Sequence, residues 1–135
     1  MSNLVEFVVY GEPCSKANSR RIVKPKGSNK MLVIKSKKAL GYVADFALQC
    51  PQIAPPIEED ISVTITIYYA SRRPDLDESV ILDCMQSQVH IDKKTKAKTL
   101  LRNNIYLNDR QVREKHIYWA LDKENPRCEI KIEAI

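Results

Sequence analysis

The stretch "DISVTITIYYA" at residues 60–70 decides the fold of this chain. Apolar or aromatic side chains occupy every second position, and hydroxyl-bearing side chains occupy the positions between them. Successive side chains of a β-strand point to opposite faces, so this alternation predicts a strand with one buried face. The predicted buried set is Ile61, Val63, Ile65, Ile67 and Tyr69. We therefore expect a sheet at the centre of the fold.

On the N-terminal side, "LVEFVVY" (4–10) has the composition of a strand, and "CSKANSRRIVKPKGSNK" (14–30) that of a loop. Residues 36–50 change to helical spacing, with Ser36 as a candidate N-cap and Pro51 just beyond the end. The apolar positions of that predicted helix are Leu40, Val43, Ala44 and Ala47.

On the C-terminal side, "DESVILDCMQSQV" (77–89) predicts a second helix, with Asp77 as a candidate cap. Residues 92–104 are typical of a flexible basic loop, and "NIYLND" (104–109) of a short strand or turn. Residues 111–121 and 127–135 then alternate as two strands, for which "DKENP" makes a hairpin plausible. The predicted apolar stripe of the second helix is Val80, Ile81, Cys84 and Met85.

This order of elements predicts an α+β fold, in which helices pack on a largely antiparallel or mixed sheet. The chain has 135 residues, enough for one core, so we expect a single domain over residues 1–135. Neither an apolar run of membrane-spanning length nor a signal peptide is seen, and a cytoplasmic location is expected. The four scattered cysteines have no zinc-site spacing and are expected to be structural.

The formal net charge is +5, and the basic residues are segregated. Residues 13–44 contain no acidic side chain, and residues 93–102 form a second basic run. Such runs favour a positive face that neutralises phosphates and releases counterions. The alternative is a solvated basic surface that has no nucleic-acid partner.

Directly after the central strand, "SRRPDLDES" (71–79) carries Asp75 and Asp77. On extended chain, positions i and i+2 point to the same side, so the two carboxylates would converge. Two such anions repel unless they share a cation, and oxygen ligands suit Mg²⁺ or Mn²⁺. In the structural alternative, Asp77 only caps a helix and Asp75 only pairs with Arg72 or Arg73.

Three sequence motifs support the hypothesis that Asp75 and Asp77 bind a metal ion. "RRPDLD" (72–77) is followed by "LDCM" (82–85) and then by "NDRQV" (108–112), and the segment "GEPCSKANSRR" (11–21) precedes all three. In this order they resemble the RusA family of Holliday-junction resolvases over nearly the whole length. The resemblance implies that Asp75, Asp77 and Asp109 are the catalytic, metal-binding aspartates.

The implied activity is Mg²⁺-dependent (or Mn²⁺-dependent) hydrolysis of DNA phosphodiesters at four-way or other branched DNA, in recombination and repair. The family acts as a homodimer, and the resemblance leaves open whether the host is a bacterium or its virus. Lys16, Arg20 and Arg21 fall where the family has basic DNA contacts, and Arg72 and Arg73 precede the aspartates and would bind phosphate or neutralise them. The other predicted DNA-binding residues belong to the second basic run: Lys93, Lys94, Lys96 and Lys98.

The match has departures. Glu78 stands where the family usually has Asn, and Ile81 where it tends to have a lysine. The spacing from Asp77 to Asp83 is two residues shorter than expected, and Asn108 replaces an aspartate. The lysines of residues 93–98 either supply the missing cation or hold DNA.

Three other hypotheses about the function therefore stay open: a module that binds branched DNA without cutting it, a nuclease for flaps or forks, and a basic surface unrelated to DNA. Tyr118 and Trp119 are expected to be hairpin core and edge residues rather than stacking platforms for bases.

Overall fold

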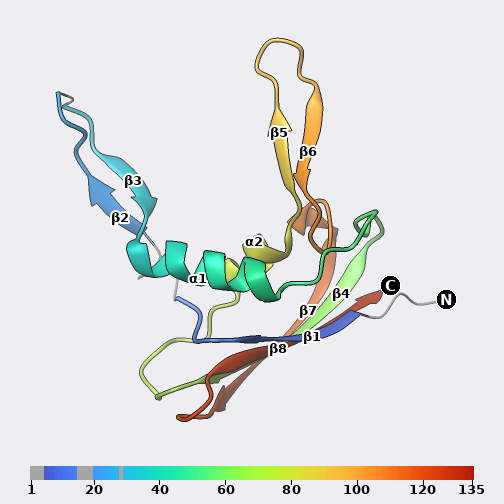
Figure 1. Ribbon diagram of the computed structural model, residues 1–135. Coiled ribbons are helices and arrows are strands. Elements are labelled where there is room, and N and C mark those ends of the chain that lie inside the picture. The colour runs from blue at the N-terminus through green and yellow to red at the C-terminus, as the bar shows by residue number, and fades with distance from the viewer. Residues whose placement is uncertain (1–4, 15–19, 28) are drawn as a thin grey trace.

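The computed structural model describes residues 5–14, 20–27 and 29–135 and has an α+β architecture. Its main sheet has the strand order β1-β8-β4-β7, and two helices lie over one face of that sheet (Figure 1). The predicted fold class is confirmed. The four strands are β1 (Val5–Tyr10), β4 (Ile61–Tyr69), β7 (Val112–Leu121) and β8 (Arg127–Ala134).

Strand β4 is the central strand that the sequence predicted. Its residues alternate strictly between buried and half-buried, with Ile61, Val63, Ile65 and Ile67 fully buried. It pairs antiparallel with β8 on one side and parallel with β7 on the other. The strand with the most buried residues thus has hydrogen-bonded neighbours along both edges.

The predicted hairpin between β7 and β8 is wrong, because β4 lies between them. The link at residues 122–126 crosses the end of β4, a span of about 10 Å at ordinary strand spacing. An ion pair from Arg127 Nη1 to Asp122 Oδ2, at 2.7 Å, joins the residues at the two ends of the link. A short polar link is compatible with either arrangement, so its length did not settle the pairing.

Helix α1 (Lys37–Gln49) begins where the sequence predicted. The Ser36 hydroxyl accepts the Ala39 N–H at 3.2 Å and caps it. The buried face consists of Ala39, Tyr42 and Phe46, whereas Leu40, predicted on the apolar stripe, is 51% exposed. Two aromatic rings, rather than the aliphatic stripe, pack toward the sheet.

Helix α2 (Ser79–Met85) is shorter than predicted. Its N-cap residue is Glu78, which makes no capping side-chain bond, so the assignment of Asp77 as the cap residue is wrong. Asp77 nevertheless accepts the Ser79 N–H through Oδ1 at 3.0 Å. The chain leaves the helix at Gln86 and becomes extended.

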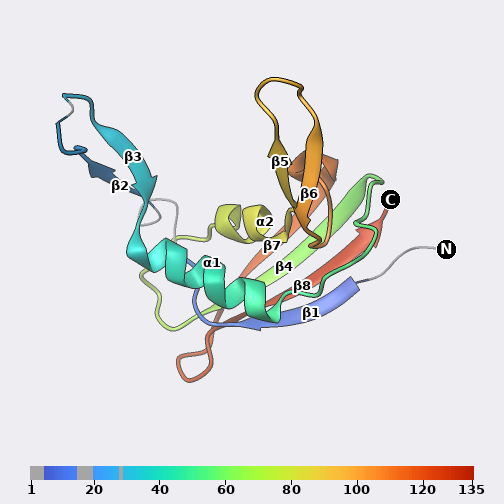
Figure 2. The ribbon, with the colours of Figure 1, turned by 45° about the horizontal axis from the view of Figure 1, so that its top comes forward.

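Two hairpins replace predicted loops. The first pairs β2 (Arg20–Val23) with β3 (Leu32–Lys35), and the second pairs β5 (Gln88–Ile91) with β6 (Lys98–Arg102). Both project away from the sheet on its helical side, well separated from each other (Figure 2). Exposed side chains on both faces of these strands leave no buried-exposed alternation, which is why the sequence pattern missed them.

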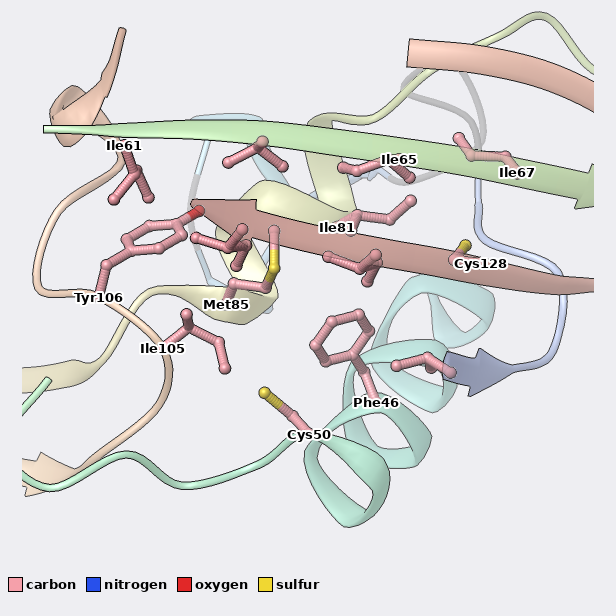
Figure 3. Packing of buried hydrophobic residues seen from close by; sticks show 14 of the residues in the cluster. Phe46, Cys50, Ile61, Ile65, Ile67, Ile81, Met85, Ile105, Tyr106 and Cys128 are labelled. Carbon is pink, nitrogen blue, oxygen red and sulfur yellow. The ribbon is translucent and has the colours of Figure 1, made fainter. Parts of the chain in front are cut away.

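The core lies between the sheet and the helices (Figure 3). Ile65 and Ile67 of β4 meet Phe46 of α1 and Ile81 and Met85 of α2 there. No helix in the described part of the chain is long and apolar enough to cross a membrane.

The cysteines are free thiols, as expected, and contribute to the core. Burial raises the pKa of Cys50 to about 11 and that of Cys128 to about 12. These two thiols are therefore protonated at neutral pH and serve packing.

Candidate active site

Asp75 and Asp77 lie in the segment that follows β4. The side chain of Tyr69, the last residue of that strand, holds the main chain of this segment. The hydroxyl of Tyr69 donates to the main-chain oxygen of Asp75 at 3.0 Å and accepts the N–H of Asp77 at 3.2 Å. Tyr69 is 2% exposed, whereas Asp75 is exposed and Asp77 half-buried. A buried side chain thus fixes the backbone that carries both carboxylates.

A third carboxylate, missed by the sequence analysis, lies at this end of the sheet. Glu12 Oε2 accepts the N–H of Ala70, directly after β4, at 2.8 Å. Burial raises the pKa of Tyr69, the N–H of Asp77 opposes the rise, and the charges of Asp77 and Glu12 add to it. Glu12 follows β1, which is not adjacent to β4, so no local pattern in the sequence links the two.

Asp109 is held at a different place. It begins the 3₁₀ turn η2 (Asp109–Gln111), and its N–H donates to Gln86 Oε1 at 3.1 Å, just past the end of α2. Burial, then the negative charges of Asp109 and Asp83, raise the pKa of Tyr106. The bond to Gln86 therefore places Asp109 near the C-terminal end of α2, the half of the helix that also carries Asp83.

Helix α2 separates the two acidic groups. It contains 7 residues and is about 10 Å long, with Asp77 before its start and Asp109 near its end. The parallel register of β4 and β7 agrees, since it aligns Ile61 with Val112, at the strand ends opposite Tyr69. The structure brings Asp75 and Asp77 to one strand end but leaves Asp109 at the other end of the helix.

Within residues 5–14, 20–27 and 29–135, no group of three or more His, Cys, Asp or Glu side chains is arranged to hold a metal ion. The set of Asp75, Asp77 and Asp109 therefore does not fit a single three-carboxylate magnesium centre within this chain. The Mg²⁺ or Mn²⁺ requirement stays a prediction from the resemblance.

The departures from the RusA pattern have structural counterparts. Ile81, at the place of the family lysine, is 0% exposed and belongs to the core. Glu78 Oε1 forms an ion pair with Lys115 Nζ at 3.2 Å, which anchors the start of α2 to β7. A lysine of β7 thus approaches the residue next to Asp77, although the sequence pattern did not place Lys115 at the site.

Gln111 has a structural role. Its Nε2 donates to the carbonyl oxygens of Ile57 and Glu59, and its Oε1 accepts the N–H groups of Leu107 and Asn108. Both ends of the amide are used by the main chain. Gln111 fixes the segment that precedes Asp109 rather than the Asp109 carboxylate.

The predicted DNA-binding residues are distributed over two hairpins and the loop after β4. In the β5–β6 hairpin every residue from 91 to 100 is exposed, including Lys93, Lys94, Lys96 and Lys98. Asp92, the one acidic residue of that tip, accepts the N–H groups of Lys94 and Thr95 at 2.8 and 3.1 Å. Its carboxylate thus holds the main chain of the turn, while the lysine side chains are exposed to solvent.

On the other hairpin, Arg21 is exposed, only the backbone of Arg20 is described, and Lys16 lies outside the described residues. Arg72 and Arg73 are exposed, and neither forms an ion pair with Asp75 or Asp77 in the described structure. The alternative in which Asp75 pairs with Arg72 or Arg73 is therefore not seen among the described residues. Both remain available to a phosphate.

No protein-family model matches the chain, and no curated protein matches it. The resemblance to the RusA family therefore rests on the three motifs, their order and the residues described above.

Proposed function

We propose that the protein is an endodeoxyribonuclease that resolves Holliday junctions or other branched DNA by paired nicking, in DNA recombination and repair. The observation that supports this most strongly is the presentation of Asp75 and Asp77 at one strand end, on backbone fixed by a buried tyrosine. The "RRPDLD" motif that carries these residues is one of the three motifs whose order makes up the RusA resemblance.

The two hairpins support a branched nucleic acid as the substrate. They stand apart on the helical side of the sheet, and the region of α1 and α2 lies between their bases (Figure 2). The tip of β5–β6 exposes Lys93, Lys94, Lys96 and Lys98, and the β2–β3 hairpin exposes Arg21, Lys24 and Lys26. Two separated cationic arms suit two DNA segments that diverge from a common point better than they suit one short ligand.

The proposal includes a homodimer and a divalent cation (Mg²⁺, or Mn²⁺ in its place), both from the resemblance, and the cytoplasmic location expected from the sequence. A two-fold dimer matches the pseudo-two-fold symmetry of a four-way junction and would allow two symmetric nicks. The DNA-binding part of the proposal does not depend on how the cation is held.

Cleavage of a labelled four-way junction with Mg²⁺ or Mn²⁺, read on a denaturing gel, tests the enzyme directly. We expect nicks near the crossover, their loss in Asp75→Asn, and junction affinity in that variant near or above the native value. Asp45→Asn is the matched control, because Asp45 is an exposed carboxylate on α1, and it should cut at the native rate. Native-rate cleavage by Asp75→Asn would contradict the site.

A second candidate is a protein that binds branched DNA without cutting it. Two observations favour it: Ile81 is buried where the family has a lysine, and no three-carboxylate group is present in the described residues. A shifted junction band with intact strands under both cations supports this candidate. Preference for flaps or forks in a competition among branched substrates would instead reassign the substrate of the nuclease.

A further inference from the structure

Trp119 forms the outer half of an aromatic stack whose inner half is Tyr69. The two ring centroids are 6.4 Å apart with an interplanar angle of 30°. Tyr69 is 2% exposed and Trp119 is 39% exposed, so the stack runs from the core to the surface. The expected role of Trp119 as a hairpin residue also fails, because β7 has β4 rather than β8 as its neighbour.

This stack is joined to the candidate site by one side chain. The same Tyr69 ring that supports Trp119 carries the hydroxyl bonded to Asp75 and Asp77. In the register of β4 and β7, Ile67 faces Trp119 and Tyr69 faces Leu121. Trp119 and Leu121, the latter 47% exposed, therefore share the helical face of the sheet at the strand end that leads to the aspartates.

We infer that Trp119 is a stacking platform for an unpaired nucleobase of branched DNA, next to the segment that carries Asp75 and Asp77. The inference deepens the proposed function and rests on it. The aspartates alone do not specify which part of the DNA the site binds. The inference specifies an unpaired base rather than a base within a paired duplex.

The chemistry around the ring suits such a base. Every nucleobase has a π face, and proteins that bind single strands combine aromatic platforms with cationic groups that track the phosphates. Arg72 and Arg73, two exposed residues in the loop after β4, supply such cations three and four residues after Tyr69. Because Tyr69 already supports one side of the indole, little side-chain freedom is lost when a base covers the other side.

Tyr118 provides an internal comparison on the same strand. It is 54% exposed and aligns with Thr66, which places it on the opposite face of the sheet from the helices and the aspartates. The inference assigns a base to Trp119 and none to Tyr118. A merely solvent-exposed aromatic would show no such distinction between the two faces.

The first test uses the fluorescence of the native protein, because Trp119 is the single tryptophan of the chain. A short duplex with a central bulge of unpaired bases and the same duplex fully paired are titrated into it. Binding is measured independently by the anisotropy of a dye on the DNA. We expect emission to be quenched by the bulged DNA, at the same concentrations that raise the anisotropy, and much less by the paired duplex.

The second test compares three variants on the bulged duplex. Trp119→Ala should weaken binding roughly 5- to 150-fold, Trp119→Phe should recover most of that loss, and Tyr118→Ala should bind within about twofold of native. Binding of fully paired duplex should change little in all three. Circular dichroism confirms that each variant is folded, and the native-protein titration stands even if Trp119→Ala is not.

The outcomes separate the two proposals. Bulged DNA that raises the anisotropy without quenching Trp119, or equal affinities for Trp119→Ala and Tyr118→Ala, would overturn the stacking platform and leave the proposed function standing. An anisotropy that stays flat for bulged and four-way DNA alike would overturn both.

Discussion

The hydroxyl of Tyr69 lies 3.0 Å from the main-chain oxygen of Asp75, to which it donates. Tyr69 is the last residue of β4 and is buried, whereas Asp75 is exposed. A core residue thereby positions a surface segment through one polar atom. The candidate site depends on the core through this contact, and substitution of the tyrosine tests that dependence.

Tyr69→Phe removes the hydroxyl and keeps the ring. The Asp75 carbonyl and the Asp77 N–H both lose a partner in a partly buried place, so we expect unfolding to become easier by about 1–2 kcal/mol. Urea denaturation measures the change. Tyr68→Phe is the control, because the Tyr68 hydroxyl has only a 3.5 Å contact with Glu129 in a half-buried position. Equal midpoints for the two variants would refute the structural role of the Tyr69 hydroxyl.

Ile81→Lys restores the residue type of the RusA pattern but should not restore its function. Ile81 is 0% exposed among apolar neighbours, so an ammonium there is buried without a partner. We expect a loss of about 3–5 kcal/mol in the free energy of unfolding. Ile81→Leu, which conserves volume, should cost less than about 1.5 kcal/mol. A stable and more active Ile81→Lys protein would show that this helix packs differently.

The exposed lysines of the β5–β6 tip should account for part of the salt dependence of DNA binding. Each phosphate contact contributes about 0.9 to the slope of log affinity against log salt, because a counterion is released. Lys93→Gln with Lys94→Gln should therefore lower that slope by up to about 1.8. Lys123→Gln with Lys131→Gln removes the same charge elsewhere and should leave the slope unchanged. A slope that is flat in the native protein would remove nucleic acid as the ligand.

The Asp122–Arg127 ion pair should make the link between β7 and β8 sensitive to acid. A hydrogen bond from Arg127 holds the pKa of Asp122 below its ordinary value of 3.8. The folded-state pKa is lowered, so the stabilisation is present above pH 3.8 and is lost as the pH falls through the lowered value. The difference in urea midpoint between native protein and Asp122→Asn should be constant from pH 5 to 7 and vanish in stronger acid. A difference that grows on acidification would contradict the sign.

The sequence predicted the features that depend on burial. The alternation at residues 60–70 located β4, and Ser36 located the start of α1, because both signals come from side chains whose environment is set locally. Asp75 and Asp77 were likewise placed at the end of β4 by their position after an apolar strand. The same reasoning failed for the two hairpins, whose strands have no buried face to create a pattern.

The sequence pattern could not predict which distant segments of the chain lie side by side. The insertion of β4 between β7 and β8, the bond from Glu12 to Ala70 and the bond from Asp109 to Gln86 all depend on how distant strands pair. The ion pair from Lys115 to Glu78 has the same origin. Motif order could match residues to roles, but it could not determine which carboxylates lie within reach of one another.

Competition between a four-way junction and linear duplexes of the same sequences, at one salt concentration, measures the preference for branched DNA on which both candidate functions depend. We expect the native protein to bind the junction at least about tenfold more tightly, a difference of about 1.4 kcal/mol or more. Equal affinity for junction and duplex would contradict the proposal, because binding would then depend only on the negative charge of the DNA and not on its branched shape.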